Sequence, residues 1–521
     1  MAYPAPDHVA YFARTRAEKL ACLDMESGRA LTYAALNARA SLAAALITEL
    51  CAQKGEAVRG ARIAVLARNS SDIVCLYVAC LRTGAILQPL NWRLAPAELD
   101  VLGRDGEPAI VIYQREFASG AEALAAACPR AVLLSLDGAR SESFEAALAQ
   151  TDGAGFRPIA PAHDGATTLL YTSGTTGAPK GVIITEANAR ANGVNYGLAA
   201  NVGGDSVFVC DMPMFHVVGL FAVTRTVLQM GATLLISPRF DAEEAVRRIG
   251  DPTLGVTHYF CVPQMAQQMR GARNFDPAFF QRLVALQTGG APHPEAAVRA
   301  WLDDGVMLID GYGMSEAGTV LGMPPGDLGV LRAKAGAAGL PALLTELRIV
   351  DSEGREVGDG DIGEIWLHGP TITPGYWRNE TATAKAFAGG WLKSGDAARR
   401  DQDGYVTLVD RWKDMFISGG ENVYPAEVEA ALLDLAGVSE AAVFGAPDPR
   451  WGETGVALIV CAPGAQLEVE IVTAHCRARL AGYKTPRHVR VVESLPRTAS
   501  GKVQKAALRA QWIAEFEERS S

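Results

Sequence analysis

The segment at residues 171–182, YTSGTTGAPKGV, combines hydroxyl side chains, glycines and a single lysine, Lys180. Backbone N–H groups that glycine frees from bulky neighbours form a concave nest for an anion, and the hydroxyls and the lysine add donors and positive charge. The segment therefore predicts a phosphate-binding loop. It is not a Walker A loop, in which the lysine follows glycine and precedes Ser or Thr, because Lys180 lies between Pro179 and Gly181. The apolar stretch VIIT that follows disfavours a flexible linker.

The composition is that of an ordinary soluble globular protein, with 49% hydrophobic residues, 20% charged residues and a net charge of −10. A chain of 521 residues exceeds the size of a single hydrophobic core, so two or more domains are expected. The acidic balance disfavours a general nucleic-acid or anionic-membrane surface, which would require a basic field. Any anionic ligand must therefore be bound by local groups.

The cysteines favour a reducing cytoplasm, because they are scattered, odd in number and without a CxxC pair, which disfavours a disulfide framework and a zinc site. The N-terminal stretch carries Asp7 and lacks a continuous apolar core, so no signal peptide is expected. Nowhere do eighteen apolar residues follow one another uncharged, and no transmembrane segment is expected. The nine cysteines are at positions 22, 51, 75, 80, 128, 210, 261, 461 and 476.

Short runs rich in Val and Ile alternate with helical patterns through about residue 340. ARIAVLARN (61–69), PAIVIYQ (108–114) and ATLLISP (232–238) predict strands, and SDIVCLYVACLRTGA (71–85) predicts a helix that ends at a cap. Strands that alternate with helices predict a parallel sheet covered on both faces, and hence an α/β body.

The pattern changes after about residue 347. LRIVD, GEIWLHG and GYVTLVD, separated by turn sequences up to residue 409, predict a small module of antiparallel strands. Beyond it, a glycine turn, a helix and a strand are followed by EIVTAHCRARLAGY, HVRVVESLP and KVQKAALRAQWIAEFEE. These segments predict a compact α+β domain of about 110 residues at the C-terminus.

Further motifs follow the phosphate-loop segment in order along the chain. They are FHVVGL (215–220), TGGAP (288–292), DGYGMSE (310–316), SGD (394–396), DRWKDMFISGGENVYPAEVE (410–429) and PRTASGK (496–502). Together with YTSGTTGAPKGV, these motifs resemble the signature of the adenylate-forming (AMP-binding) superfamily, which includes the acyl-CoA and aryl-CoA synthetases. The resemblance covers nearly the whole chain.

The resemblance implies an α/β fold with a large N-terminal domain of packed α/β subdomains and a small β-rich module, residues 1–410. A mobile α+β lid domain, residues 411–521, would follow, with a hinge near Lys413. The implied activity is that of an ATP-dependent acid:CoA ligase, which forms an acyl adenylate with release of pyrophosphate and then transfers the acyl group to the thiol of CoA. ATP, Mg²⁺ and coenzyme A are the expected cofactors.

In the first step two anions meet, and at about 4 Å and an effective dielectric near 20 unit charges repel by about 4 kcal/mol, so cations and oriented donors are required. The resemblance makes Lys502 the lysine that holds the α-phosphate and the substrate carboxylate, and Glu316 the Mg²⁺ ligand, with Thr172 and His216 as further catalytic residues. The nucleotide-binding residues that it implies are Thr172, Ser173, Gly174, Thr175, Thr176, Gly177, Lys180, Gly290, Ala291, Pro292, Asp310, Gly311, Tyr312, Gly313, Met314, Ser315, Asp396 and Arg411.

CoA must attack the same carbonyl, so Lys502 cannot stay in place for both steps. By resemblance, the C-terminal domain turns at Lys413, which absorbs a large change in backbone dihedral angles. The glycine turn at 418–421 would then line a narrow tunnel for the pantetheine arm. The residues expected to bind CoA are Arg93, Ser418, Gly419, Gly420, Glu421, Trp451, Tyr483, Lys484 and Arg487.

The acyl pocket is expected to be uncharged and fairly deep. Amino-acid substrates are disfavoured because His216 stands where amino-acid-activating relatives carry an ammonium-binding Asp. His216 has no second ligand at metal spacing, so we expect a gate residue instead of a metal ligand. The pocket favours an aromatic acid of benzoate or cinnamate type, or a medium- to long-chain aliphatic acid, over acetate. Its expected residues are His216, Val217, Val218, Gly289, Gly311 and Gly313.

Two alternative functions remain open. An acyl-AMP ligase that loads a carrier protein often carries an insertion in the large domain, and no obvious insertion is present. A catalytically inactive binding protein would have lost Lys502, Glu316 or Asp396, and all of them are retained. The expected partners are a carboxylic acid, ATP and CoA, without nucleic acid, and the sequence leaves both a monomer and a homodimer open.

Overall fold

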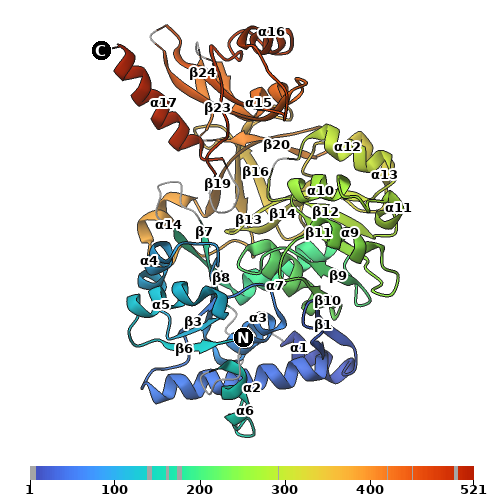
Figure 1. The fold of residues 1–521 in the computed structure, drawn as a ribbon, viewed down its shortest axis with the longest axis vertical. Coiled ribbons are helices and arrows are strands. Elements are labelled where there is room, and N and C mark those ends of the chain that lie inside the picture. The colour runs from blue at the N-terminus through green and yellow to red at the C-terminus, as the bar shows by residue number, and fades with distance from the viewer. Residues whose placement is uncertain are drawn as a thin grey trace. The chain divides into compact units, whose positions relative to one another are not determined.

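The computed structural model describes the chain outside residues 1–6, 138–142, 160–163, 173–178, 292, 413, 419–420, 449, 498–502 and 521. The chain divides into two compact units (Figure 1). Unit 1 comprises Met1–Leu347 and Leu367–Leu392, and unit 2 comprises Arg348–Trp366 and Lys393–Ser521. The domain boundary expected at residues 410 and 411 stays a prediction.

Unit 1 contains a six-stranded sheet that is parallel except at one edge. Its order is β6 (Val132–Ser135), β5 (Ile110–Tyr113), β3 (Arg62–Leu66), β4 (Ile86–Pro89), β7 (Ala166–Thr172) and β8 (Lys180–Thr185). Strands β3 and β5 confirm the predictions made from the two Val/Ile-rich segments. At the edge, β7 and β8 form an antiparallel hairpin in which Thr172 pairs with Lys180. The described ends of the phosphate-loop motif therefore lie opposite each other.

The second sheet of unit 1 has nine strands. Its order is β15 (Leu340–Pro341), β14 (Gly318–Gly322), β13 (Leu308–Met314), β12 (Ala285–Thr288), β11 (His258–Cys261), β9 (Val207–Cys210), β10 (Thr233–Ile236), β1 (Leu20–Asp24) and β2 (Ala30–Thr32). The strands from β13 to β1 pair in parallel as predicted. The outer strands β14, β15 and β2 add antiparallel pairs, because a hairpin needs only a short connection.

Helices of unit 1 connect and cover these strands. The predicted helix at 71–85 is α3, nearly all of it buried, and it ends at Gly84, whose φ of 70° requires the left-handed region that glycine tolerates. The helices are α1 (His8–Thr15), α2 (Tyr33–Gln53), α3 (Ser71–Thr83), α4 (Pro96–Gly106), η1 (Arg115–Phe117), α5 (Ala118–Ala127), α6 (Phe144–Gln150), α7 (Glu186–Ala199), η2 (Val218–Arg225), α8 (Thr226–Met230), α9 (Ala242–Gly250), α10 (Pro263–Arg270), α11 (Pro277–Phe280), α12 (Glu295–Asp303), α13 (Leu328–Ala333) and α14 (Glu380–Ala386).

Among the described helices, α2 alone is long and apolar enough to cross a membrane by length and composition. In its most apolar window, 44% is buried inside the protein. Its contacts with α1, α3 and α6 fit the core helix of a folded unit, which meets the same criterion.

The β-rich module predicted after residue 347 is a five-stranded sheet formed by β16 (Glu346–Val350), β17 (Gly363–His368), β19 (Trp391–Arg400) and β18 (Phe387–Ala388), with β20 (Val406–Arg411) on β19. Residues 416–520 of unit 2 form a sheet packed with helices around a core that includes Phe416, Val428 and Val443. Its elements are β21 (Phe416–Ser418), β22 (Glu421–Val423), α15 (Pro425–Leu433), β23 (Val438–Asp448), β24 (Gly452–Cys461), α16 (Val469–Arg479), β25 (His488–Val491) and α17 (Lys505–Ser520). The predicted α+β fold of this region is confirmed.

Candidate active site

The base of the phosphate-loop hairpin carries a cation beside an aromatic ring. Tyr376 forms an antiparallel bridge with Val182 of β8, so the segment around it continues the sheet past the hairpin. The Lys180 Nζ atom lies 5.1 Å from the centre of the Tyr376 ring, within the range of a cation–π interaction. Strand pairing between segments far apart in the sequence thus places Tyr376 next to the motif lysine.

Tyr376 also contacts the predicted magnesium ligand. Its hydroxyl donates to Glu316 Oε1 at 2.9 Å, and the Thr373 backbone N–H donates to the Glu316 carbonyl oxygen at 2.8 Å. Burial and the neighbouring Glu316 carboxylate raise the pKa of Tyr376, so this hydroxyl stays protonated and remains a donor. Tyr376 links Lys180 to Glu316, although it belongs to none of the recognised motifs.

Glu316 suits a magnesium ion that arrives with a nucleotide. Mg²⁺ is usually held by one or two carboxylates together with substrate phosphates. One Glu316 oxygen accepts from Tyr376, and no hydrogen bond from the described residues reaches Oε2, which could bind a cation. Within the described part of the chain, no group of three or more His, Cys, Asp or Glu side chains could hold a metal by itself. A metal at Glu316 would therefore share its coordination with phosphate oxygens.

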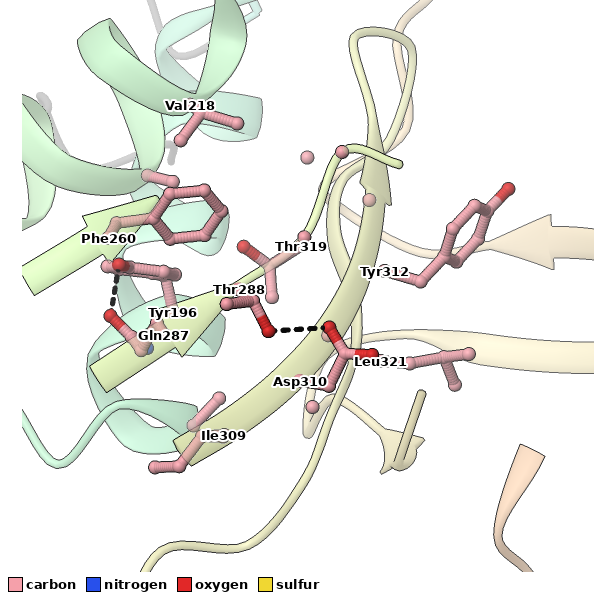
Figure 2. Close-up of a pocket in the computed structure, with 18 of the residues that line it drawn as sticks. Tyr196, Val218, Phe260, Gln287, Thr288, Ile309, Asp310, Tyr312, Thr319 and Leu321 are labelled. Carbon is pink, nitrogen blue, oxygen red and sulfur yellow. Dashed lines mark hydrogen bonds between the residues drawn. The ribbon is translucent and has the colours of Figure 1, made fainter. Parts of the chain in front are cut away.

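A pocket opens beside the β13–β14 hairpin that carries Glu316 at its turn (Figure 2). It contains about 590 Å³ of space free of atoms, part of which is open to solvent. Apart from Asp310, no lining side chain carries a formal charge. The lining residues are Asn192, Tyr196, Ala199, Val217, Val218, Ala222, Phe260, Gln287, Thr288, Gly289, Gly290, Ile309, Asp310, Gly311, Tyr312, Gly313, Gly318, Thr319, Leu321 and Gly322.

A chain of three hydrogen-bonding side chains lies at Asp310. Thr288 Oγ1 donates to Asp310 Oδ1 at 2.9 Å (Figure 2). Since that bond uses the only hydroxyl proton, Thr288 must accept from His293, whose Nδ1 lies 3.1 Å away. Burial lowers the pKa of His293 to about 4. Burial raises the pKa of Asp310 to about 7, against the hydrogen bonds from Thr288 and the Gly311 backbone. His293 was missed although it directly follows the TGGAP motif.

The helix η2 forms one wall of the pocket through Val218 and Ala222. It is a π-helix, a rare conformation that is frequent at functional sites. Its last residue, Arg225, is 1% exposed and donates to both carboxylate oxygens of Glu186 at 2.7 and 3.0 Å and to the Tyr77 hydroxyl at 2.9 Å. Because Glu186 begins α7, this buried ion pair ties together two helices that line the pocket.

Most of the predicted acyl-pocket residues come together in this pocket. They are Val217, Val218, Gly289, Gly311 and Gly313. His216 is not among the lining residues. Its ring centre lies 4.5 Å from that of Phe215, and the Arg93 guanidinium lies 5.6 Å from the Phe215 ring. Arg93 also lies 4.2 Å from the Trp92 ring. The gate role of His216 and the CoA role of Arg93 stay predictions.

Some of the predicted nucleotide-binding residues lie at the pocket, and others lie elsewhere or outside the described part of the structure. Gly290, Asp310, Gly311, Tyr312 and Gly313 line the pocket, and Ala291, Met314 and Ser315 adjoin it in the chain. The predicted residues that lie outside the described part of the structure are Ser173, Gly174, Thr175, Thr176, Gly177, Pro292, Lys413, Gly419, Gly420 and Lys502.

In unit 2, two of the predicted nucleotide-binding residues lie opposite each other on neighbouring strands. Asp396 on β19 is opposite Arg411 on β20 in the antiparallel register. Asp396 is 7% exposed, and its backbone N–H donates to Ser394 Oγ at 3.0 Å. The β19–β20 pair therefore brings two motifs together at one point of the sheet.

The predicted CoA residues of unit 2 gather partly around Trp451. The guanidinium groups of Arg450 and Arg487 each lie 5.0 Å from the Trp451 ring. Ser418 pairs with Gly452, the residue that follows Trp451. An aromatic ring with two cations could stack on a base and bind phosphate. Arg450 was missed, because a lone arginine beside a tryptophan gives no sequence signal.

Lys484, another predicted CoA residue, forms an ion pair with Glu427. Its Nζ donates to both carboxylate oxygens of Glu427 at 2.7 and 2.8 Å, so its charge already has a partner. Tyr483 is 36% exposed, and its ring centre lies 5.8 Å from Lys484 Nζ. Glu421 begins β22 and pairs with Ser418 across the turn. The CoA roles of these residues stay predictions.

Two family models match the chain. The model of the AMP-binding enzyme covers residues 9–377, and the model of the AMP-binding enzyme C-terminal domain covers residues 427–502. The chain belongs to the AMP-binding enzyme family. The predicted membership of the adenylate-forming superfamily is thereby confirmed, and the two matched regions correspond to different parts of the chain.

Similar proteins extend over almost the full length. A feruloyl-CoA synthase of Amycolatopsis is 37% identical over 96% of this chain and 97% of its own. A long-chain-fatty-acid–CoA ligase of Mycobacterium tuberculosis is 34% identical over 93% of both chains. A fatty acid–[acyl-carrier-protein] ligase of Streptomyces coeruleorubidus is 33% identical over 92% of both. The crystal structure of ATP-bound MatB from Rhodopseudomonas palustris superposes with a TM-score of 0.87 at 30% identity, over 97% of this chain and 99% of that one. The predicted fold and the predicted class of AMP-forming acid:CoA ligase are confirmed.

Proposed function

We propose that this acid:CoA ligase activates an aromatic acid or a medium- to long-chain aliphatic acid. The observation that carries the proposal is the pocket beside the hairpin of Glu316, whose lining is uncharged apart from Asp310. Glu316 in turn contacts Tyr376, which lies beside Lys180. Apolar lining favours the hydrocarbon part of an acid. The feruloyl-CoA synthase and the long-chain-fatty-acid–CoA ligase to which the chain is similar, by their names, act on acids of these two kinds.

In the first half-reaction, the residues of unit 1 would hold the nucleotide and the acid. Thr172 and Lys180 would donate to phosphate oxygens at the hairpin base, and Glu316, oriented by Tyr376, would hold Mg²⁺. The bound metal would supply positive charge to the phosphates. Asp310 would accept from the exocyclic amine of adenine. Fixed donors of this kind stabilise the charge that develops as the carboxylate attacks the α-phosphorus and pyrophosphate leaves.

Unit 2 would contribute to both half-reactions. Asp396 and Arg411 would bind the ribose, and Lys502 would lend its charge to the α-phosphate and the acid carboxylate during adenylation. A turn of the C-terminal domain at Lys413 would then withdraw Lys502 and admit CoA. The CoA thiol, with an ordinary pKa of about 8.5, is mostly protonated at pH 7, so the protein has to orient it towards the adenylate carbonyl.

Acid-dependent pyrophosphate release tests the acyl assignment. The purified protein, ATP and Mg²⁺ would be assayed with benzoates, cinnamates, straight-chain acids, acetate and amino acids. Benzoates, cinnamates or straight-chain acids of medium to long chain are expected to give the highest kcat/KM. A response to acetate or amino acids alone would refute the pocket assignment.

A second candidate, loading of a carrier protein, is supported by the similarity to the fatty acid–[acyl-carrier-protein] ligase. The same pyrophosphate release would accompany either activity, so the acceptor has to be tested separately. With CoA as acceptor we expect an acyl-CoA product under conditions in which a phosphopantetheinyl carrier protein gives little product. Dominant acylation of the carrier would favour the second candidate. A cytoplasmic location stays a prediction, as does the choice between monomer and homodimer.

A further inference from the structure

The helix α7 contributes a polar side chain to an otherwise apolar wall of the pocket. Asn192, Tyr196 and Ala199 are spaced by four and three residues, so they lie on one face of the helix, and all three line the pocket. Asn192 is only 3% exposed. A carboxamide this deeply buried loses its hydrogen bonds to water, so each of its donors and acceptors needs a partner.

Among the described residues, only one end of the Asn192 amide has such a partner. Its Oδ1 accepts from the Thr319 backbone N–H at 2.7 Å, and this contact fixes which end of the amide is oxygen and which is nitrogen. Its Nδ2 is buried without any hydrogen-bond partner among the described residues. A flip of the amide would not solve the problem, because it would place N–H groups against the Thr319 N–H.

Other polar side chains of the pocket are already engaged. The Tyr196 hydroxyl donates to Gln287 Oε1, and Thr288 donates to Asp310 (Figure 2). Asn192 is thus a pocket-lining residue whose Nδ2 donor has no partner among the described residues.

Small residues of β14 allow this strand to pack closely against Asn192 and α7. A Cβ atom at Gly318 would lie 2.5 Å from Asn192 Oδ1, and Gly318 has a φ of 63°, so both the neighbouring amide and the backbone select glycine. Further along the same wall, a Cβ at Gly322 would lie 3.1 Å from the Ala199 side chain. The wall formed by α7 and β14 therefore combines a narrow packing distance with the Asn192 donor, which the described residues leave without a partner.

We propose that the acid activated in this pocket carries a neutral oxygen acceptor remote from its carboxyl group, such as a ring hydroxyl, ether or carbonyl oxygen, and that Asn192 Nδ2 donates to it. This inference rests on the proposed function, which assigns the pocket to the acyl group. An unsubstituted alkyl or aryl group would fill the pocket but leave the donor without a partner. A site built to hydrogen-bond a substrate oxygen discriminates strongly against an analogue that lacks it.

Matched acids provide the test. Pyrophosphate release would be measured with 3-phenylpropenoic acid and with its 4-methyl, 4-hydroxy and 4-methoxy derivatives, along with their 3-substituted isomers and straight-chain acids. The wild-type protein is expected to use the best methoxy acid with a kcat/KM about tenfold or more above that of the methyl acid at the same position, mainly through KM. The methyl group matches much of the size of the methoxy group and lacks the oxygen.

The variant Asn192→Asp separates the hydrogen bond from packing. Its carboxylate oxygen can still accept from Thr319 N–H, while the N–H₂ group is replaced by a second acceptor. In this variant, the kcat/KM for the methoxy acid divided by that for the methyl acid should fall to about one. The hydroxy acid should lose less than the methoxy acid, because a phenol can donate to the new acceptor. If the variant does not fold, the comparison of acids on the wild-type protein still decides the question.

The outcomes distinguish this inference from the function on which it rests. If no acid in the panel supports pyrophosphate release, the proposed function and this inference both fail. If acids are activated but the methyl and methoxy acids are used equally well, or an unsubstituted straight-chain acid is preferred to all aryl acids, the inference alone is overturned. A wild-type preference for methoxy that persists in Asn192→Asp would also overturn it, because the preference would then have another origin.

Discussion

At the scale of single residues, Tyr376 is the side chain that joins the motif lysine to the motif glutamate. Substituting Tyr376→Phe keeps the ring beside Lys180 and removes the hydroxyl that donates to Glu316. A hydrogen bond to a charged group contributes about 1.5–3 kcal/mol, so the rate of adenylation should fall about tenfold or more. The Mg²⁺ concentration for half-maximal activity should rise. Pyrophosphate release titrated with Mg²⁺ measures both effects, and an unchanged Mg²⁺ dependence would contradict the role given to Tyr376.

Asp310 predicts a pH dependence of nucleotide affinity. The carboxylate, not the neutral acid, is the better acceptor for the adenine amine, so binding should favour the deprotonated form. With a pKa raised to about 7 by burial, affinity for a non-hydrolysable ATP analogue should increase as the pH rises from 6 to 8. His293, with its pKa lowered to about 4, does not titrate in this range.

The variant Asp310→Asn is the control for this pH dependence, because it keeps an acceptor oxygen and removes the titration. Any change of nucleotide affinity with pH that remains in the variant is due to titration of the ligand phosphates and of other groups. Calorimetric titrations at several pH values would compare the two proteins. Parallel profiles for wild type and variant would exclude Asp310 as the titrating group.

Residue types that belong to ordered motifs could be predicted from the sequence, and residues that only tertiary structure brings to the site could not. Glu316 and Asp310 lie in DGYGMSE, and the structure places them on one hairpin beside the pocket. Tyr376 reaches Glu316 only because its segment pairs with β8, almost two hundred residues earlier. The importance of Asn192 depends on which end of its amide meets Thr319, which no local pattern encodes.

At the scale of elements, the π-helix η2 depends on a buried ion pair. Substituting Arg225→Met would remove the cation that donates to both oxygens of buried Glu186 and leave only Arg190, whose Nε lies 4.0 Å from Glu186 Oε1. Breaking a buried pair in this way costs about 3–5 kcal/mol. The free energy of unfolding should fall by about that amount, and the acid preference should change because η2 and α7 both line the pocket. Denaturant unfolding and the acid panel would measure the two effects.

An exposed ion pair offers the matched control for Arg225. Arg247 contacts Glu244 three residues earlier on α9, and both side chains are about half exposed. Such pairs contribute roughly 0–1 kcal/mol, so Arg247→Met should change neither stability nor acid preference appreciably. Equal losses in the two variants would contradict the anchoring role of Arg225.

Strands and helices with strong periodicity were predictable as elements. Strands β3, β5 and β10 and helix α3 follow from their apolar patterns and caps. The π-helix was not predictable, because the run VVGLFAV (217–223) is apolar throughout and shows no periodicity. The contacts of Arg225 with α7 and α3 appear only in the folded structure. Strand pairing at the sheet edges was also missed, because short antiparallel strands carry little periodicity of their own.

At the scale of the whole molecule, the described residues of the two units carry complementary sets of groups. Unit 1 holds the pocket, Glu316 and Lys180, and unit 2 holds the Asp396–Arg411 pair and the cluster around Trp451. The proposed reaction needs both sets, first for adenylation and then for thioester formation. The central claim is that the C-terminal domain turns between these two steps. This claim requires that Lys502 acts in the first step only.

The most direct measurement of this claim compares the two half-reactions in the variant Lys502→Ala. Acid-dependent pyrophosphate release should fall by at least about a hundredfold, because the charge on the α-phosphate and the carboxylate would lose its main cation. Conversion of a supplied acyl adenylate and CoA into acyl-CoA should retain most of the wild-type rate. Equal loss of both half-reactions, or adenylation at the wild-type rate, would contradict the account.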